Sequence, residues 1–113
     1  MKIYHNPRCS KSRQTLDLIK QKTKNYEIIE SLNEPLEFDD YKLILEKMEL
    51  KPINLVRIKE TIWKEKYKGE EMSDDDIIKA LVDNPKLMER PIVTTNKQAI
   101  IGRPPENVLN LFS

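Results

Sequence analysis

The sequence predicts an α/β fold in which a β-α-β segment and a later β-β-α segment form one sheet, with a helical subdomain inserted between them. The β-prone runs lie in the first 29 and the last 23 residues, whereas the middle of the chain has the apolar spacing of helices. A length of 113 residues suits one domain. We therefore expect a single domain over residues 1–113, with the helical insertion at about 36–88.

The first segment begins with a β-prone run at residues 2–5 that ends at the turn signal Asn6-Pro7. Leu16 and Ile19 then lie three residues apart among lysines and glutamines, which predicts a helix from Ser10 to about Lys22. A second strand is expected at residues 26–29. These elements form the β-α-β segment.

The middle of the chain is predicted to be helical. Pro35 suits the first turn of a helix over about 36–48, and Pro52 opens a short helical stretch. Ser73 with Asp76 three residues later predicts the capped start of a further helix, which ends before Asn84-Pro85. Between these helices, Trp63 and Tyr67 are four residues apart and can pack together.

The last part of the chain predicts a hairpin and a helix. Two β-prone runs, at residues 91–95 and 98–101, are separated by Asn96-Lys97. Pro104-Pro105 then begins a final helix. The order from end to end is β-α-β, helices, and β-β-α.

Composition excludes several classes of function. Lys and Arg total 20 against 19 Asp and Glu, which disfavours a general nucleic-acid or membrane-surface protein. No apolar run approaches the length of a membrane helix, and no leader peptide opens the chain, so we expect a cytoplasmic protein. Two glycines cannot form a phosphate-binding or dinucleotide-binding loop. One cysteine excludes an internal disulfide, and with one histidine it gives no metal site.

Cys9 lies at the predicted corner between the first strand and the first helix. A helix N-terminus presents free N–H groups and partial positive charge, which stabilise a thiolate relative to a thiol. Arg8 and Arg13 add positive charge, and the Ser12 hydroxyl could donate a hydrogen bond to the sulfur. Free cysteines are often small buried residues, but this polar corner favours a nucleophile. His5 is either a general base or cation near the sulfur, or a hydrogen-bonded turn residue.

The run from His5 to Leu16 resembles the active-site motif of the glutaredoxin-coupled arsenate reductases, which belong to the arsenate reductase/Spx superfamily with a thioredoxin-like fold. His5-Asn6-Pro7, Cys9, Ser12-Arg13 and Thr15-Leu16 stand as in the family pattern HNPxCxxSRxTL. Three later segments also match in order. They are Leu55-Val56-Arg57, Arg90-Pro91-Ile92-Val93 and Gly102-Arg103-Pro104.

The resemblance implies an arsenate reductase of arsenic detoxification. Cys9 would attack arsenate, and Arg57, Arg90 and Arg103 would bind the oxyanion. Glutathione would be a co-substrate rather than a bound cofactor, and glutaredoxin would resolve the Cys9–arsenic–glutathione adduct. His5, Ser12 and Arg13 would support the site, and Pro91 would be a cis-proline. Guanidinium groups suit this substrate because they bind tetrahedral oxyanions with two hydrogen bonds.

Two other functions stay open at this point. A redox-sensing transcriptional regulator of the Spx type usually has a Cys-x-x-Cys switch, whereas this chain has Ser12 in the second position. A monothiol glutaredoxin-like thiol carrier would fit Cys9-x-x-Ser12, but the helical insertion is large for that class. A phosphatase Cys-x5-Arg loop is excluded, because position 15 is Thr15.

Overall fold

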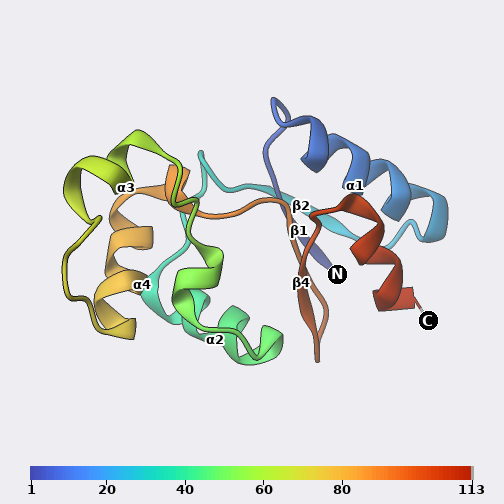
Figure 1. Ribbon diagram of the computed structural model, residues 1–113. Helices are drawn as coiled ribbons and strands as arrows, with labels where there is room; N and C mark the ends of the chain where they lie inside the picture. Colours follow the sequence, from blue (N-terminus) through green and yellow to red (C-terminus); the bar gives the residue numbers. More distant parts are fainter. Residues whose placement is uncertain (113) are drawn as a thin grey trace. The chain divides into compact units, whose positions relative to one another are not determined.

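The computed structural model describes residues 1–112 and divides into two compact units. The first unit contains residues 1–34 and the segment from Arg90 onward, and the second contains Pro35–Glu89. The second unit covers nearly the same residues as the insertion that the sequence predicts. Figure 1 shows the sheet strands and the two terminal helices in the first unit, and a group of short helices in the second.

The first unit is built on a four-stranded sheet of order β2-β1-β3-β4. Its strands are β1 (Lys2–His5), β2 (Glu27–Glu30), β3 (Ile92–Thr94) and β4 (Ala99–Ile101). β1 pairs in parallel with β2, while β3 pairs antiparallel with both β1 and β4. This confirms the predicted thioredoxin-like α/β fold. In this register His5, at the end of β1, lies beside Glu30 at the end of β2.

Two helices complete the first unit, and they lie side by side in Figure 1. Helix α1 (Ser10–Lys22) has the predicted bounds, and η3 (Pro105–Phe112) is the final helix. η3 is a 3-10 helix, so it has a tighter turn than the α-helix expected at the end of the β-β-α segment. The apolar sides of both helices and of the sheet meet in one core. Its buried members are Ile3, Leu16, Ile19, Val93 and Val108.

The second unit consists of five short helices. They are α2 (Phe38–Met48), η1 (Pro52–Leu55), α3 (Thr61–Lys66), α4 (Asp74–Asp83) and η2 (Pro85–Leu87). α4 contacts α2, η1 and η2, and Tyr41 on α2 donates a hydrogen bond to the Leu81 carbonyl on α4 at 3.5 Å. Trp63 and Tyr67 do pack together, with ring centroids 5.4 Å apart. The unit therefore has its own buried interior around α4.

The ends of the helices follow their capping residues. α4 begins after Ser73, whose hydroxyl accepts from Asp76 N and whose N–H donates to the Asp76 carboxylate, both at 3.1 Å. This is the predicted capping box. The prediction for α2 was wrong at its start: the helix begins at Phe38, beyond Pro35 and residue 36. Glu37 caps it, with its N–H donating to the Asp40 carboxylate at 2.9 Å, so the chain before Glu37 stays outside the helix.

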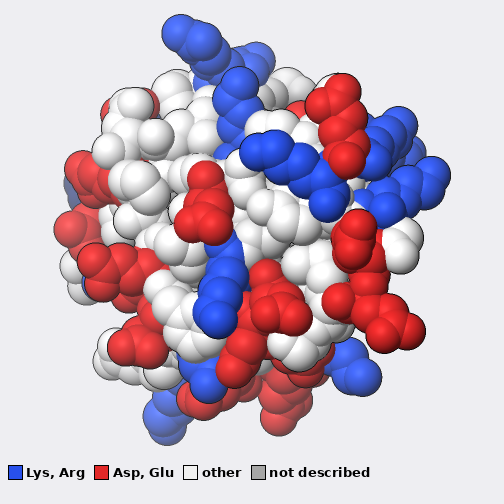
Figure 2. Space-filling model, turned by 90° about the vertical axis from the view of Figure 1, so that its left-hand side faces the viewer, with Lys and Arg blue, Asp and Glu red and all other residues white. Residues whose placement is uncertain are grey.

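Helix length and surface charge were compared with the expectations from composition. Within residues 1–112, no helix is long and apolar enough to span a bilayer. On the face drawn in Figure 2, Lys and Arg side chains lie among Asp and Glu side chains instead of forming one basic surface. That distribution agrees with the balanced composition.

Candidate active site

Cys9 is the N-cap residue of α1, and its side chain is partly exposed. Its N–H donates to the Asn6 carbonyl at 3.0 Å, and its own carbonyl accepts from Arg13 N at 3.0 Å in the first helical turn. The backbone of Cys9 is thus fixed on both sides. The sulfur stands where the first N–H groups of the helix are free to stabilise negative charge.

The Ser12 hydroxyl forms hydrogen bonds within the loop that carries Cys9 and not with the Cys9 sulfur. Its fully buried hydroxyl accepts from Asn6 N at 3.0 Å and lies 2.6 Å from His5 Nδ1. Having accepted from Asn6, the hydroxyl can give its proton to a neutral His5. The prediction that this hydroxyl donates a hydrogen bond to the sulfur is therefore wrong. The backbone N–H of Ser12 donates to the sulfur instead.

His5 is a buried hydrogen-bonded residue at the end of β1. Burial lowers its pKa below the usual 6.5, against the opposing effect of Glu30; Lys20 and Arg13 lower the pKa further. The imidazole is thus mostly neutral at pH 7. Of the two roles that the sequence left open, the geometry favours the turn residue. Arg13 also acts on this loop, because its guanidinium donates to the Pro7 carbonyl at 2.9 Å.

Arg103 connects the segment that begins at Arg90 to the Cys9 sulfur. Its Nε donates to the Arg90 carbonyl at 2.7 Å, and its Nη2 lies 3.3 Å from Cys9 Sγ. Arg90 is buried, and it precedes the fully buried Pro91. The Arg90–Pro91 bond is cis, as the resemblance implied, and the Arg103–Pro104 bond is cis as well. Cys9 and Arg103, which are 94 positions apart in sequence, thus meet at the sulfur.

The surroundings of Cys9 favour the thiolate. Burial alone would raise the pKa of the thiol, but four groups oppose it: the Ser12 N–H, the Arg103 guanidinium, the Lys11 N–H and the Arg90 guanidinium. Their combined effect holds the pKa of Cys9 below its ordinary value. A larger fraction of the protein therefore has a nucleophilic sulfur at neutral pH.

Gly102 is a residue whose importance the sequence reasoning missed. A Cβ at this position would lie 2.7 Å from Thr15 Oγ1 and 2.9 Å from Pro91 Cγ. The Gly102 carbonyl accepts from Thr15 Oγ1 at 3.3 Å, and its N–H donates to the Pro91 carbonyl at 2.9 Å. Only glycine allows this close approach of the Arg103 segment to α1 and Pro91. Its place beside Arg103, as one of two glycines in the chain, was the available signal.

Arg57 lies in the second unit, after η1. Its N–H donates to the Leu87 carbonyl at 2.7 Å, and its guanidinium forms a salt bridge with Glu60 at 3.2 Å. Both groups of this pair are partly exposed. The inclusion of Arg57 in an oxyanion-binding set with Arg90 and Arg103 stays a prediction.

A cavity borders the loop that carries Cys9, and no metal cluster accompanies it. The cavity has a volume of about 280 Å³ and is lined by residues 5–8 together with Glu30, Leu32 and Asn33. Nothing in the sequence marked Glu30, which the parallel pairing of β1 and β2 brings beside His5. In the part of the chain that the structure describes, no three His, Cys, Asp or Glu side chains converge to hold a metal ion.

Comparison with known proteins gives consistent matches over nearly the whole chain. The model of the ArsC family matches residues 4–111. An uncharacterized Escherichia coli protein, YfgD, is 45% identical over 98% of this chain and 95% of its own length. An arsenate reductase of Neisseria meningitidis is 37% identical over 96% of this chain and 94% of its own. The solved structure of an arsenate reductase from Vibrio cholerae superposes with a TM-score of 0.91 at 40% identity, covering 97% of each chain.

Proposed function

The chain belongs to the ArsC family, and we propose that it reduces arsenate to arsenite with Cys9 as nucleophile and with glutathione and glutaredoxin as the reductants. The observation that carries the proposal is the contact between Arg103 Nη2 and Cys9 Sγ at 3.3 Å, with Arg90 held to the same guanidinium. A cationic group beside a thiolate is what an anionic electrophile needs, because it offsets the repulsion between two negative charges. Relatives named arsenate reductase support this choice of substrate.

In the first step, the Cys9 thiolate attacks arsenic, a sulfur–arsenic bond forms, and one arsenate oxygen leaves as water after protonation. Arg90 and Arg103 neutralise the charge on the remaining oxygens, and we propose that Arg57 does so too. Charge-assisted hydrogen bonds of this kind contribute about 1.5–3 kcal/mol each. Arsenic is still in its +5 state at this point, so no electrons have yet moved.

Reduction then requires two thiols from outside the chain. The glutathione thiol displaces a second oxygen, which also leaves as water, and gives an adduct with arsenic between two sulfurs. A glutaredoxin thiol next attacks the glutathione sulfur. The mixed disulfide between glutaredoxin and glutathione leaves, the sulfur–arsenic electron pair stays on arsenic, and arsenic becomes +3. Water then releases arsenite and returns Cys9 as a thiol.

The single cysteine supports an external reductant. Cys9 has no second cysteine in the chain with which to form a disulfide. The two electrons that arsenate takes up must therefore come from other thiol molecules. Such thiols are kept reduced in the cytoplasm, where we propose that the reaction takes place.

Arsenite formation with glutathione and glutaredoxin tests the proposal. We expect the wild-type protein to turn over and Cys9→Ser to lose activity to the detection limit, because a hydroxyl at this position is not ionised. Matching far-UV circular dichroism spectra of Cys9→Ser and the wild-type protein control for loss of the fold. Arsenite production by Cys9→Ser would overturn the mechanism. Reduction of a small disulfide but not of arsenate by the wild-type protein would instead indicate a thiol carrier.

A further inference from the structure

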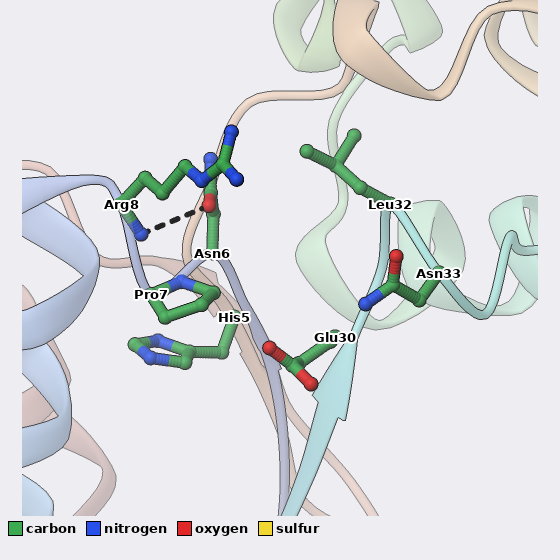
Figure 3. A pocket seen from close by; sticks show the side chains of 7 residues that line it. All are labelled: His5, Asn6, Pro7, Arg8, Glu30, Leu32 and Asn33. Carbon is green, nitrogen blue, oxygen red and sulfur yellow. Dashed lines mark hydrogen bonds between the residues drawn. The ribbon is translucent and has the colours of Figure 1, made fainter.

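The cavity beside the Cys9 loop has two walls of different charge. Residues 5–8 form one wall, and Glu30, Leu32 and Asn33 form the other, around a volume of about 280 Å³. In Figure 3, the Glu30 carboxylate and the Asn33 amide point into the space between the walls, and Arg8 stands on the opposite side. The cavity thus offers a cation and an anion to the same occupant.

Both charges are available for binding. Within residues 1–112, neither the Arg8 guanidinium nor the Glu30 carboxylate makes a hydrogen bond or an ion pair with another side chain. Both side chains are exposed, while His5 and Asn6 below them are buried. An occupant with both signs of charge could bind each group without separating an existing pair.

Hydrogen bonds hold the backbone of both walls in place. Asn6 Oδ1 accepts from Arg8 N at 3.1 Å, and the Glu30 carbonyl accepts from the N–H groups of Asn33 and Glu34 at 2.9 Å. The parallel pairing of His5 with Glu30 joins the two walls. A preformed cavity of this kind loses less entropy when it binds a ligand.

We propose that this cavity binds the γ-glutamyl end of glutathione, with its α-carboxylate on Arg8 and its α-ammonium on Glu30. The inference rests on the proposed function, which requires this thiol. The volume lies near the lower limit of about 300 Å³ for small-molecule sites, so it suits one amino-acid end of the tripeptide. Arg8 adjoins Cys9 in sequence, and a tripeptide spans about 10 Å when extended. The cysteinyl residue of glutathione directly follows the γ-glutamyl end, so its thiol would stay beside the loop that carries Cys9.

Steady-state kinetics of Glu30→Gln test this assignment. We expect the KM for glutathione to rise about two- to fivefold, the range for an exposed charge pair, with kcat unchanged. Glu27→Gln is the matched control, because it removes the same charge from the same strand outside the cavity. The KM for arsenate reports any general electrostatic effect, which both variants would share.

A glutathione analogue without the α-amino group, glutaryl-Cys-Gly, isolates the proposed contact. Its KM should be equal in the wild-type protein and in Glu30→Gln. An unchanged KM for glutathione in Glu30→Gln, or the same increase in Glu27→Gln, would overturn the assignment and leave the proposed function intact.

Binding of S-methylglutathione, which cannot react, separates the two proposals. We expect its NMR shift changes to centre on residues 5–8 and 30–33 and to weaken in Glu30→Gln. If the wild-type protein makes no arsenite, the proposed function fails, and this binding experiment still decides the site. Shift changes elsewhere, or none, would refute the cavity as the glutathione site.

Discussion

Arg103 has two hydrogen-bonding tasks that a lysine could not perform together. Its Nε donates to the Arg90 carbonyl at 2.7 Å while Nη2 faces Cys9 Sγ at 3.3 Å. A guanidinium has five N–H donors in a fixed plane, whereas an ammonium is a point charge. One side chain therefore ties the segment before Pro91 to the nucleophile.

We expect Arg103→Met to raise the pKa of Cys9, because the guanidinium is one of the groups that stabilise the thiolate. The acid limb of kcat/KM should then move to higher pH, and arsenate turnover should fall by about tenfold or more through the loss of a charged hydrogen bond. Absorbance of the thiolate near 240 nm, followed against pH, measures the shift. Arg103→Lys should restore part of the pKa effect. A thiolate titration that is unchanged in Arg103→Met would contradict this account.

At this scale the sequence pattern placed Cys9 at a helix start, which the structure shows. Arg103, in contrast, was named only through the resemblance to a known family. The partner of Ser12 could not be predicted, because the His5 contact depends on how the strand end and the first helical turn fold onto each other. The hydroxyl of a serine three residues after a cysteine can form a hydrogen bond either with the sulfur or with the loop before the cysteine.

At the scale of elements, Gly102 sets how closely β4 and the Arg103 segment approach α1. We expect Gly102→Ala to destabilise the protein by about 1–3 kcal/mol, because the new methyl group would overlap Thr15 and Pro91. Activity should fall more than the folded fraction, since Arg103 is the next residue. Thermal unfolding and activity on the same sample test this. Gly69→Ala is a control without steric overlap, although its positive φ adds backbone strain. Full activity of Gly102→Ala would contradict the expected displacement.

The capping box of α4 allows a test of the second unit. We expect Ser73→Ala to lower the free energy of unfolding by about 1 kcal/mol, because Asp76 N loses its acceptor. Urea unfolding followed by circular dichroism measures the change. Ser73→Asp should recover much of the stability. Equal stability of Ser73→Ala and the wild-type protein would mean that this cap is replaced by water.

Element order was predictable because apolar periodicity is a local property. The start of α2 was not, since Pro35 and Glu37 are both acceptable near a helix N-terminus, and the Asp40 hydrogen bond decides between them. The sequence pattern also could not predict that η3 is a 3-10 helix and not an α-helix. Apolar spacings of three and four residues fit a 3-10 helix and an α-helix alike.

For the molecule as a whole, the shifted pKa values of His5 and Tyr41 make stability depend on pH on the acid and the alkaline side. The pKa of His5 is lowered, so the unfolded chain binds a proton more readily, and stability should fall as the pH drops below about 6.5. Burial raises the pKa of Tyr41, so stability should also fall above about pH 10, where the unfolded phenol ionises. Urea midpoints from pH 5 to 11 measure both limbs. His5→Asn should flatten the acid limb and Tyr41→Phe the alkaline limb; a midpoint independent of pH would contradict both.

The Ser12 hydrogen bonds have a consequence for protein engineering. A second cysteine at position 12 would provide an internal disulfide partner, and so a reductase that recycles itself with one fewer helper protein. The same substitution would remove the hydroxyl that holds Asn6 and His5, and thiols are weak hydrogen-bonding groups. A cysteine at position 12 would thus weaken the hydrogen bonds that hold the loop around Cys9. The proposed dependence on an external thiol thus goes together with a loop that the Ser12 hydroxyl holds in place.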